Sequence, residues 1–243
     1  MSTPSPMLVE RPRNRLLSAL PDDVYAEIAQ HLTPTTLHQR DIIYEYNQPI
    51  PAVCFPNTGV VSWLSEGGEP GELVEVATCG YEGYVGTPLF LGVDSTPGTG
   101  IVQIAGAGYM MPAKAFVECS RMPGPFRDVL GRYTQVLMNS MAQTAVCNRV
   151  HPINERCARW LLLTHDRVGG DTFGLTQEFL AQMLGVRRAS VTVAASMLQQ
   201  AGFITYSRGS MTILNREGLE GASCDCYGIV RETFETYLGT KAG

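Results

Sequence analysis

Three arginines late in the chain are the residues best placed to do chemistry. Arg187 and Arg188 are adjacent, Arg208 follows them, and Glu178 is the one acidic residue within residues 176–214. A guanidinium can form paired hydrogen bonds with a phosphate or with the edge of a guanine. Because the whole chain has a net charge of −5, this basic segment is a local exception. It predicts contact with a polyanion.

Residues 175–214 have the pattern of two short helices followed by a hairpin. Thr176 is a good N-cap, Gly185 ends the first helix, and apolar residues recur on one face of each helix. Ser207 and Ser210 bound a turn between two strand-like runs. This order predicts a winged helix-turn-helix, whose second helix enters the major groove of DNA. Core spacing alone also fits a helical hairpin without a nucleic-acid partner, but the β-hairpin and the arginines favour DNA.

Length and composition indicate a globular protein with room for two domains in 243 residues. The seven cysteines are scattered and odd in number, which suits reduced thiols better than a disulfide framework. No apolar run approaches the roughly 18 residues needed to span a bilayer, and the N-terminus lacks a signal-peptide core. We therefore expect a cytoplasmic protein with no membrane partner. His38 is the one histidine in residues 35–111, whereas a metal-dependent enzyme of the cupin type needs a cluster of histidine and glutamate ligands. We therefore expect no catalytic residues.

The first half of the chain has the pattern of many short strands separated by turns that contain Gly and Pro. This texture predicts a β-roll, and the helices elsewhere make the fold class α+β. We expect an N-terminal double-stranded, jelly-roll-like β-roll, a long dimerisation helix and a C-terminal winged helix-turn-helix. The expected divisions are a sensor domain at 14–124, a linking helix at 125–147, a DNA-binding domain at 148–216 and a helical tail at 217–243.

The linking helix carries an apolar stripe that fits two roles. It can pack on the β-roll, or it can pair with the same helix of a second copy. A helix between a sensor and a DNA-binding domain is well placed for the second role, so we expect the stripe along or beside the seam of a homodimer. Its residues are Phe126, Leu130, Tyr133, Leu137 and Met141.

The order of these parts resembles the Crp/Fnr family of bacterial transcription regulators, over roughly residues 16–214. The most specific segments are LTQEFLAQMLGVRRASVTVAASMLQQAGFI with the hairpin after it, and NERCARWLLLTHDRV before it. The first half of the chain matches more weakly, through the segment IIYEYNQPIPAVCFPNTGVVSWL. The resemblance implies a homodimer that binds a palindromic site in double-stranded DNA and contacts RNA polymerase.

The sequence departs from the members of this family that bind cyclic AMP. Those members use a Gly-Glu pair for the ribose and an Arg-Ser or Arg-Thr pair for the cyclic phosphate. Here Thr87 follows Gly86, and Gly98 precedes Thr99, so the acidic and the cationic side chains are both missing. We therefore expect Gly86, Thr87 and Thr99 to line a pocket for an unknown small-molecule effector, if any, and not for a cyclic nucleotide.

The sequence also predicts no cofactor and no metal. The iron–sulfur cluster of the Fnr type needs clustered cysteines near the N-terminus, and the first cysteine here is Cys54. Cys224 and Cys226 are closely spaced, but two thiols fall short of the usual four ligands.

The recognition helix departs from the best-known members as well. Arg188 keeps the first arginine position, whereas Ala189 and Val193 replace a glutamate and a second arginine. Arg188 can pair with guanine, while Ala189 and Val193 can only pack against thymine methyls. The full set of expected DNA contacts is Thr176, Gln177, Arg187, Arg188, Ala189, Ser190, Thr192, Val193 and Arg208. An alternative stays open, in which a ligand-binding β-roll carries a helical domain that docks a protein partner. The sequence does not identify the effector or operator, or distinguish activation from repression.

Overall fold

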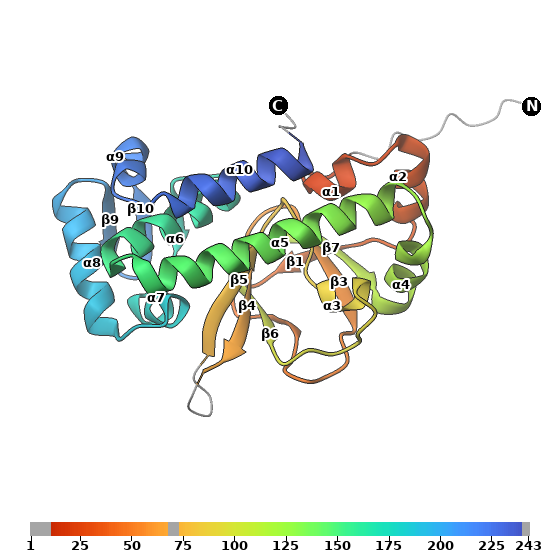
Figure 1. The fold of residues 1–243 in the computed structure, drawn as a ribbon, viewed down its shortest axis with the longest axis horizontal. Coiled ribbons are helices and arrows are strands. Elements are labelled where there is room, and N and C mark those ends of the chain that lie inside the picture. Colours follow the sequence, from red (N-terminus) through yellow and green to blue (C-terminus); the bar gives the residue numbers. More distant parts are fainter. Residues whose placement is uncertain (1–10, 68–72, 240–243) are drawn as a thin grey trace, which may run out of the picture.

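The computed structural model of the chain describes residues 11–67 and 73–239. Figure 1 shows a β-roll, a long helix along the molecule and a smaller C-terminal domain. The helices are α1 (Arg15–Ser18), α2 (Asp22–Ala29), α3 (Thr87–Phe90), α4 (Ala113–Arg121), α5 (Pro125–Val150), α6 (Ile153–Val168), α7 (Gln177–Leu184), α8 (Arg188–Gln200), α9 (Arg216–Gly221) and α10 (Cys226–Leu238). The strands are β1 (Thr33–Leu37), β2 (Ile42–Tyr44), β3 (Ala52–Pro56), β4 (Val60–Glu66), β5 (Leu73–Cys79), β6 (Thr99–Ile104), β7 (Gly106–Pro112), β8 (Thr172–Gly174), β9 (Ile204–Ser207) and β10 (Ser210–Ile213).

Two antiparallel sheets form the β-roll. One has the strand order β1-β7-β3 and the other has the order β2-β6-β4-β5. The α+β fold class predicted from the sequence is confirmed. β1 was not predicted from the sequence, because Pro34 and three threonines obscure the alternation of a strand. Proline is tolerated there because β1 lies at the edge of its sheet.

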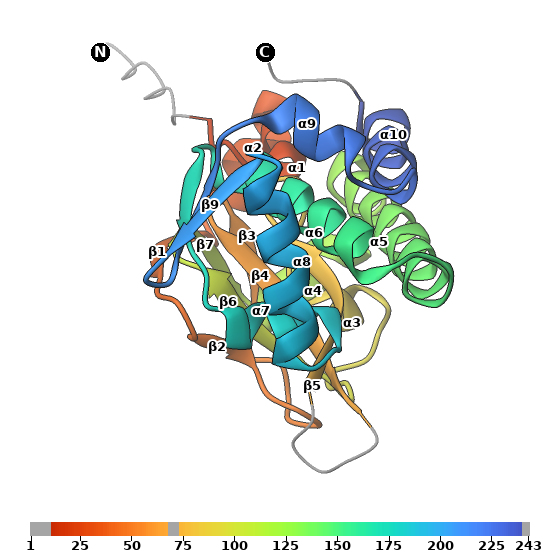
Figure 2. The ribbon, with the colours of Figure 1, turned by 90° about the vertical axis from the view of Figure 1, so that its left-hand side faces the viewer.

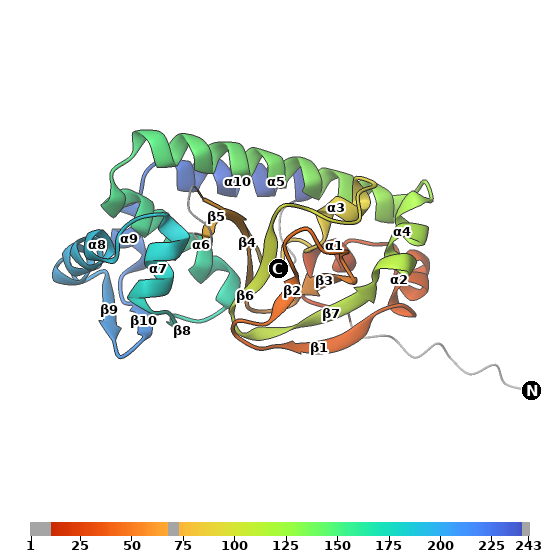
Figure 3. The same ribbon diagram turned by 90° about the horizontal axis from the view of Figure 1, so that it is seen from below.

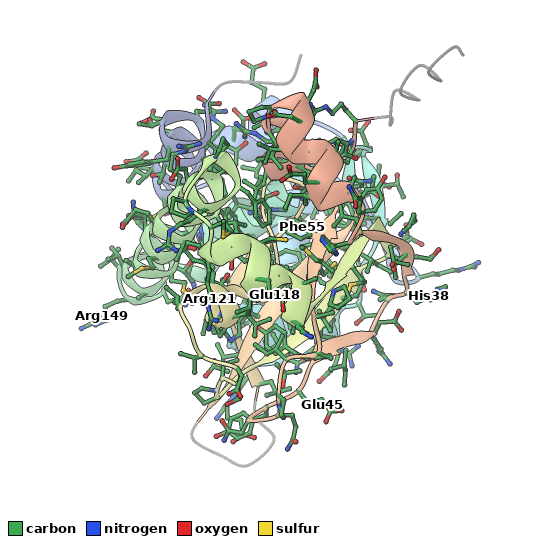
Figure 4. All side chains as sticks on the ribbon, turned by 90° about the vertical axis from the view of Figure 1, so that its right-hand side faces the viewer. His38, Glu45, Phe55, Glu118, Arg121 and Arg149 are labelled. Carbon is green, nitrogen blue, oxygen red and sulfur yellow. The ribbon has the colours of Figure 1, made fainter. Side chains whose placement is uncertain are left out.

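Aromatic side chains fill the core of the roll. Phe55, on β3, is fully buried, while the labelled polar side chains around it lie on the outside (Figure 4). The Tyr84 ring lies 5.9 Å from the Phe55 ring and 5.2 Å from the ring of Tyr133, between centroids. Since Tyr133 belongs to α5, this cluster attaches the long helix to the roll.

α5 runs along one side of the molecule, as Figures 1 and 3 show. It ends at Val150, three residues beyond the boundary at 147 expected from the sequence. No helix-breaking residue occurs before Pro152, and proline disfavours helical geometry in the residue before it. His151 accordingly has the extended angles φ −105° and ψ 143°.

The apolar stripe of α5 packs within one chain. Leu130 and Tyr133 are fully buried, Phe126 and Leu137 are nearly so, and all four belong to the core of the roll; Met141 is half-buried against it. The roll therefore covers this stripe within one chain, and its place along or beside a dimer seam stays a prediction. The exposed side of α5 contains Met138, whose side chain is 58% exposed.

The C-terminal domain is a helical unit with a three-stranded sheet of order β8-β10-β9. α10 then returns along α5 (Figure 1). The tail expected at 217–243 thus holds most of α9 and all of α10, and residues 240–243 lie outside the described part. One apolar core joins the two halves of the molecule, because Val60, Leu64 and Ile104 of the roll pack with Trp160 of α6. In the part of the chain that the structure describes, no helix is long and apolar enough to cross a membrane.

Candidate nucleic-acid interface

The helix-turn-helix is formed by α7 and α8. The Thr176 hydroxyl caps α7 by accepting a hydrogen bond from the Phe179 N–H at 3.1 Å. Gly185 ends α7 in the left-handed conformation, with φ 62°, which permits an immediate turn into α8. The two helices pack through buried apolar side chains, namely Leu180, Ala181, Leu184, Val191, Ala194 and Leu198. This packing turns the opposite side of α8 to solvent.

That outer side of α8 carries most of the expected base-contacting residues. Arg188, Ala189, Thr192 and Val193 are all exposed, and the Val193 side chain is 60% exposed although it is apolar. Figure 2 shows α8 on the side of the domain that faces the viewer. Ser190 is half-buried, so it can offer only part of its surface.

Two contacts within the domain position this surface. The Thr192 hydroxyl donates a hydrogen bond to Gln177 Oε1 at 2.9 Å, which links α8 to the first turn of α7. Arg188 and Glu178 form an ion pair at 3.9 Å with both side chains largely exposed. Such an exposed ion pair contributes little to stability, so Arg188 can leave Glu178 at a small cost in free energy. Arg187 is exposed at the N-cap of α8.

The wing is a hairpin of β9 and β10 with Arg208 and Gly209 at its tip. Both residues have positive φ, 50° and 80°, which is the geometry of a two-residue turn matched to the twist of the strands. The Leu175 N–H donates a hydrogen bond to the Gly209 carbonyl at 2.8 Å. A Cβ at Gly209 would lie 3.8 Å from Thr176 Cγ2. The exposed side chain of Arg208 therefore extends from a tip that sits beside the start of α7.

Two residues that the sequence analysis missed hold the wing against the helices. The Tyr206 hydroxyl accepts a hydrogen bond from the Gln177 N–H at 3.0 Å. The Tyr206 N–H donates to Gln199 Oε1 on α8 at 2.8 Å. No sequence pattern marks Gln199 or Tyr206, because each residue acts through a contact between elements that are separate in the sequence. The structure thus brings Thr176, Gln177, α8 and Arg208 together.

The expected effector pocket is nearly filled. Gly86 and Thr87 line a cavity of about 20 Å³, whereas Thr99 lies outside its lining. A side chain at Gly98 would overlap the Trp63 indole, and one at Gly100 would clash with the Tyr44 ring. The cavity holds about one water molecule.

A buried carboxyl joins the roll to the C-terminal domain. Glu75 of β5 is 8% exposed, and its Oε1 accepts a hydrogen bond from Trp160 Nε1 of α6 at 2.8 Å. Ser62 lies within hydrogen-bond distance of its Oε2, at 2.8 Å. Burial raises the pKa of Glu75 to about 7, although the two hydrogen bonds lower it. The junction between the domains therefore contains a group that titrates near neutral pH.

Comparison with known proteins supports the predicted family. Residues 155–222 match the family model of the Crp-like helix-turn-helix domain. A comparison with curated proteins gave no match. The fold resembles a putative transcriptional regulator of the Crp/Fnr family from Eubacterium rectale, with 18% identity and a TM-score of 0.62 over 85% of this chain and 96% of that chain.

Two further solved structures share the fold. FixK2 from Bradyrhizobium japonicum is 16% identical, with a TM-score of 0.64 over 79% of this chain and 98% of that one. The c-di-GMP responsive global regulator CLP from Xanthomonas campestris is 14% identical, with a TM-score of 0.61 over 79% and 99%. Residues 155–222 are therefore a Crp-like helix-turn-helix domain, carried by a chain that has the fold of the Crp/Fnr regulators.

Proposed function

We propose that this protein regulates transcription by binding a palindromic operator as a homodimer, with α8 in the major groove. The observation that carries the proposal is the single surface formed by the outer side of α8, the start of α7 and the tip of the wing. In this arrangement a helix and a basic hairpin can contact one duplex together. Contact with RNA polymerase, or obstruction of it, would convert binding into regulation.

The exposed residues suggest how the operator is read. Arg188 would leave Glu178 and form two hydrogen bonds with a guanine, and Ala189 and Val193 would pack on thymine methyls. The phosphate contacts would come from Thr176, Gln177, Arg187, Ser190 and Arg208, with Thr192 positioned by Gln177.

We propose that the exposed side of α5, rather than its buried stripe, forms the dimer seam. Four small or apolar residues and one glutamine recur there at steps of four and three, as in a coiled coil: the half-buried Gly131 and the exposed Gln135, Met138, Ala142 and Ala145. The small side chains would let two helices approach closely. Arg149, near the end of this side, projects away from the body of the molecule (Figure 4).

We further propose that the roll does not respond to cyclic AMP or cyclic GMP. Ligand pockets usually exceed roughly 300 Å³, against the 20 Å³ found beside Thr87. Two missing anchors, each worth about 1.5–3 kcal/mol, would also weaken binding by a factor on the order of a hundred to ten thousand. Calorimetry with either nucleotide checks this, and micromolar affinity coupled to tighter DNA binding would overturn it.

More space lies in a cleft of about 480 Å³ between the N-terminal segment, α6 and α10, lined by Arg13, Tyr81, Arg167 and Phe234 among others. An effector of ordinary size would bind there rather than in the roll. The related fold of CLP serves a c-di-GMP responsive regulator, so the fold alone does not select the effector.

Binding of a random-sequence duplex at several salt concentrations tests the DNA-binding role. The logarithm of the binding constant should fall linearly with the logarithm of salt, by about 0.9 for each neutralised phosphate. If the helical domain docks a protein instead, the chain should show no duplex binding even at low salt.

A further inference from the structure

A cluster of three thiols and an imidazole lies where α5 ends and α10 begins. Cys147 is in the last turn of α5, His151 follows that helix, and Cys224 and Cys226 flank the N-cap of α10. One ligand atom from each residue, three Sγ atoms and one imidazole nitrogen, lies within 4.8 Å of all the others. Cys147 Sγ is 3.5 Å from Cys224 Sγ, and Cys226 Sγ is 3.5 Å from His151 Nδ1.

The fold assembles this cluster from two distant segments. The His151 N–H donates a hydrogen bond to the Cys147 carbonyl at 3.1 Å, so these two residues lie together at the end of α5. α10 packs along α5 and brings Cys224 and Cys226 to that end. The two thiols that appeared too few in the sequence thus gain two further ligands.

We propose that Cys147, His151, Cys224 and Cys226 bind one zinc ion in a tetrahedral Cys₃His site. Zn–S bonds of about 2.3 Å and a Zn–N bond of about 2.1 Å place tetrahedral ligand atoms about 3.6–3.8 Å apart. The two 3.5 Å contacts are close to that spacing, and the upper limit of 4.8 Å requires movements of about an ångström or less. A [4Fe–4S] cluster, in which each ligand binds a different iron, requires wider spacing.

Arg159, which is buried, and Arg156, which is half-buried, give independent support. Arg159 is 5% exposed, and its Nε has no hydrogen-bond partner among the described residues; the same holds for Arg156 Nε. No carboxylate of the described part forms an ion pair with either of them. Zinc with three thiolates and a neutral histidine has a net charge of −1. It would provide the counter-charge that a desolvated guanidinium requires.

The surroundings also fit a metal-bound thiolate. Gln143 Nε2 donates a hydrogen bond to Cys226 Sγ at 3.0 Å, which is how outer side chains orient ligands and tune the metal. Burial raises the pKa of the Cys147 thiol, while the neighbouring Arg159 guanidinium lowers it. Zinc would displace the thiol protons on binding.

A bound ion would have a clear structural role. It would join the start of α10 to the turn between α5 and α6, through His151 and the adjacent Pro152. The position of the C-terminal domain relative to α5 would then depend on the metal. A disulfide between Cys147 and Cys224 is the competing use of these thiols. Its formation would require an added oxidant and an approach of the two sulfurs to about 2.05 Å. It would also leave His151 and Cys226 without a role.

The test is metal analysis of the full chain, purified under reducing conditions with zinc supplied. We expect one zinc ion per chain. After its removal, Co²⁺ should give thiolate-to-metal charge-transfer absorption and the intense visible bands of tetrahedral cobalt. Cys226→Ser and His151→Ala should each lose zinc affinity by at least about tenfold. Cys119→Ser, which changes a half-buried thiol of α4, is the matched control and should keep the ion.

The wild-type cobalt spectrum keeps the test decisive if a cysteine variant fails to fold. The proposal is wrong if the reduced wild-type chain binds neither zinc nor cobalt, or if cobalt shows only the weak bands of an octahedral site. It is also wrong if mass spectrometry of the reduced sample finds a Cys147–Cys224 disulfide, or if Cys119→Ser loses zinc as completely as Cys226→Ser. None of these readouts depends on DNA binding.

Discussion

Replacing Glu75 with glutamine should change how the stability of the protein depends on pH. In the folded chain this carboxyl is buried between the roll and α6, with Trp160 Nε1 and the Ser62 hydroxyl as its partners. Burial raises its pKa to about 7 from an ordinary value of 4.5. Between these two values the folded state holds a proton that the unfolded chain has released.

The sign and the size follow from that difference. Since the folded state binds more protons, its stability should fall as the pH rises from about 4.5 to about 7. Each unit of difference in pKa corresponds to about 1.36 kcal/mol, so the full loss is about 3 kcal/mol. Glu75→Gln keeps a neutral acceptor for Trp160 and removes the titration. The variant should match the wild type at acidic pH and exceed its stability by about 3 kcal/mol above neutral pH.

Urea unfolding followed by tryptophan fluorescence, at several pH values across this window, measures the difference in the free energy of unfolding. Comparing variant with wild type removes the titration of all other groups. Glu66→Gln, at the exposed end of β4, controls for the loss of one negative charge. A difference between Glu75→Gln and wild type that stays constant with pH would refute the reasoning.

Two further predictions concern DNA and the dimer. Arg188→Ala should weaken operator binding by about 1–3 kcal/mol and relax the preference at one base pair per half-site. Arg208→Ala should instead weaken binding to all duplexes and reduce the slope of the salt dependence by about 1. Titrations on matched and mismatched duplexes distinguish the two effects. On α5, Met138→Glu should give folded monomers, because that side chain is 58% exposed, while Leu137→Glu, at 6% exposure, should lower stability by burying a charge in the roll. Sedimentation and thermal unfolding of both variants check this, and a stable Met138→Glu dimer would place the seam elsewhere.

The winged helix-turn-helix was predictable because its determinants are local. The Thr176 cap, the left-handed Gly185 and the turn at Arg208 and Gly209 each lie within a few residues of the element they shape. The overall order of roll, long helix and DNA-binding domain followed from the periodicity of the apolar residues and from the family resemblance. The observed fold and its likeness to solved Crp/Fnr regulators confirm this order, and the family-model match covers residues 155–222 of it.

The features that the sequence analysis missed depend on contacts between distant segments. Both sides of α5 carry apolar or small residues, so periodicity could not decide which side the roll covers. Trp63 and Gly98 meet only after β4 and the loop before β6 come together. Cys147 and Cys224 are 77 residues apart, and only the return of α10 along α5 unites them.

The most direct test of the central claim is to enrich random double-stranded DNA on the purified protein and to sequence what is retained. We predict an inverted repeat whose half-sites lie about one helical turn apart, each with a guanine that Arg188→Ala no longer selects. Retention of duplexes without any common sequence, at every salt concentration and with or without cell extract, would contradict the account.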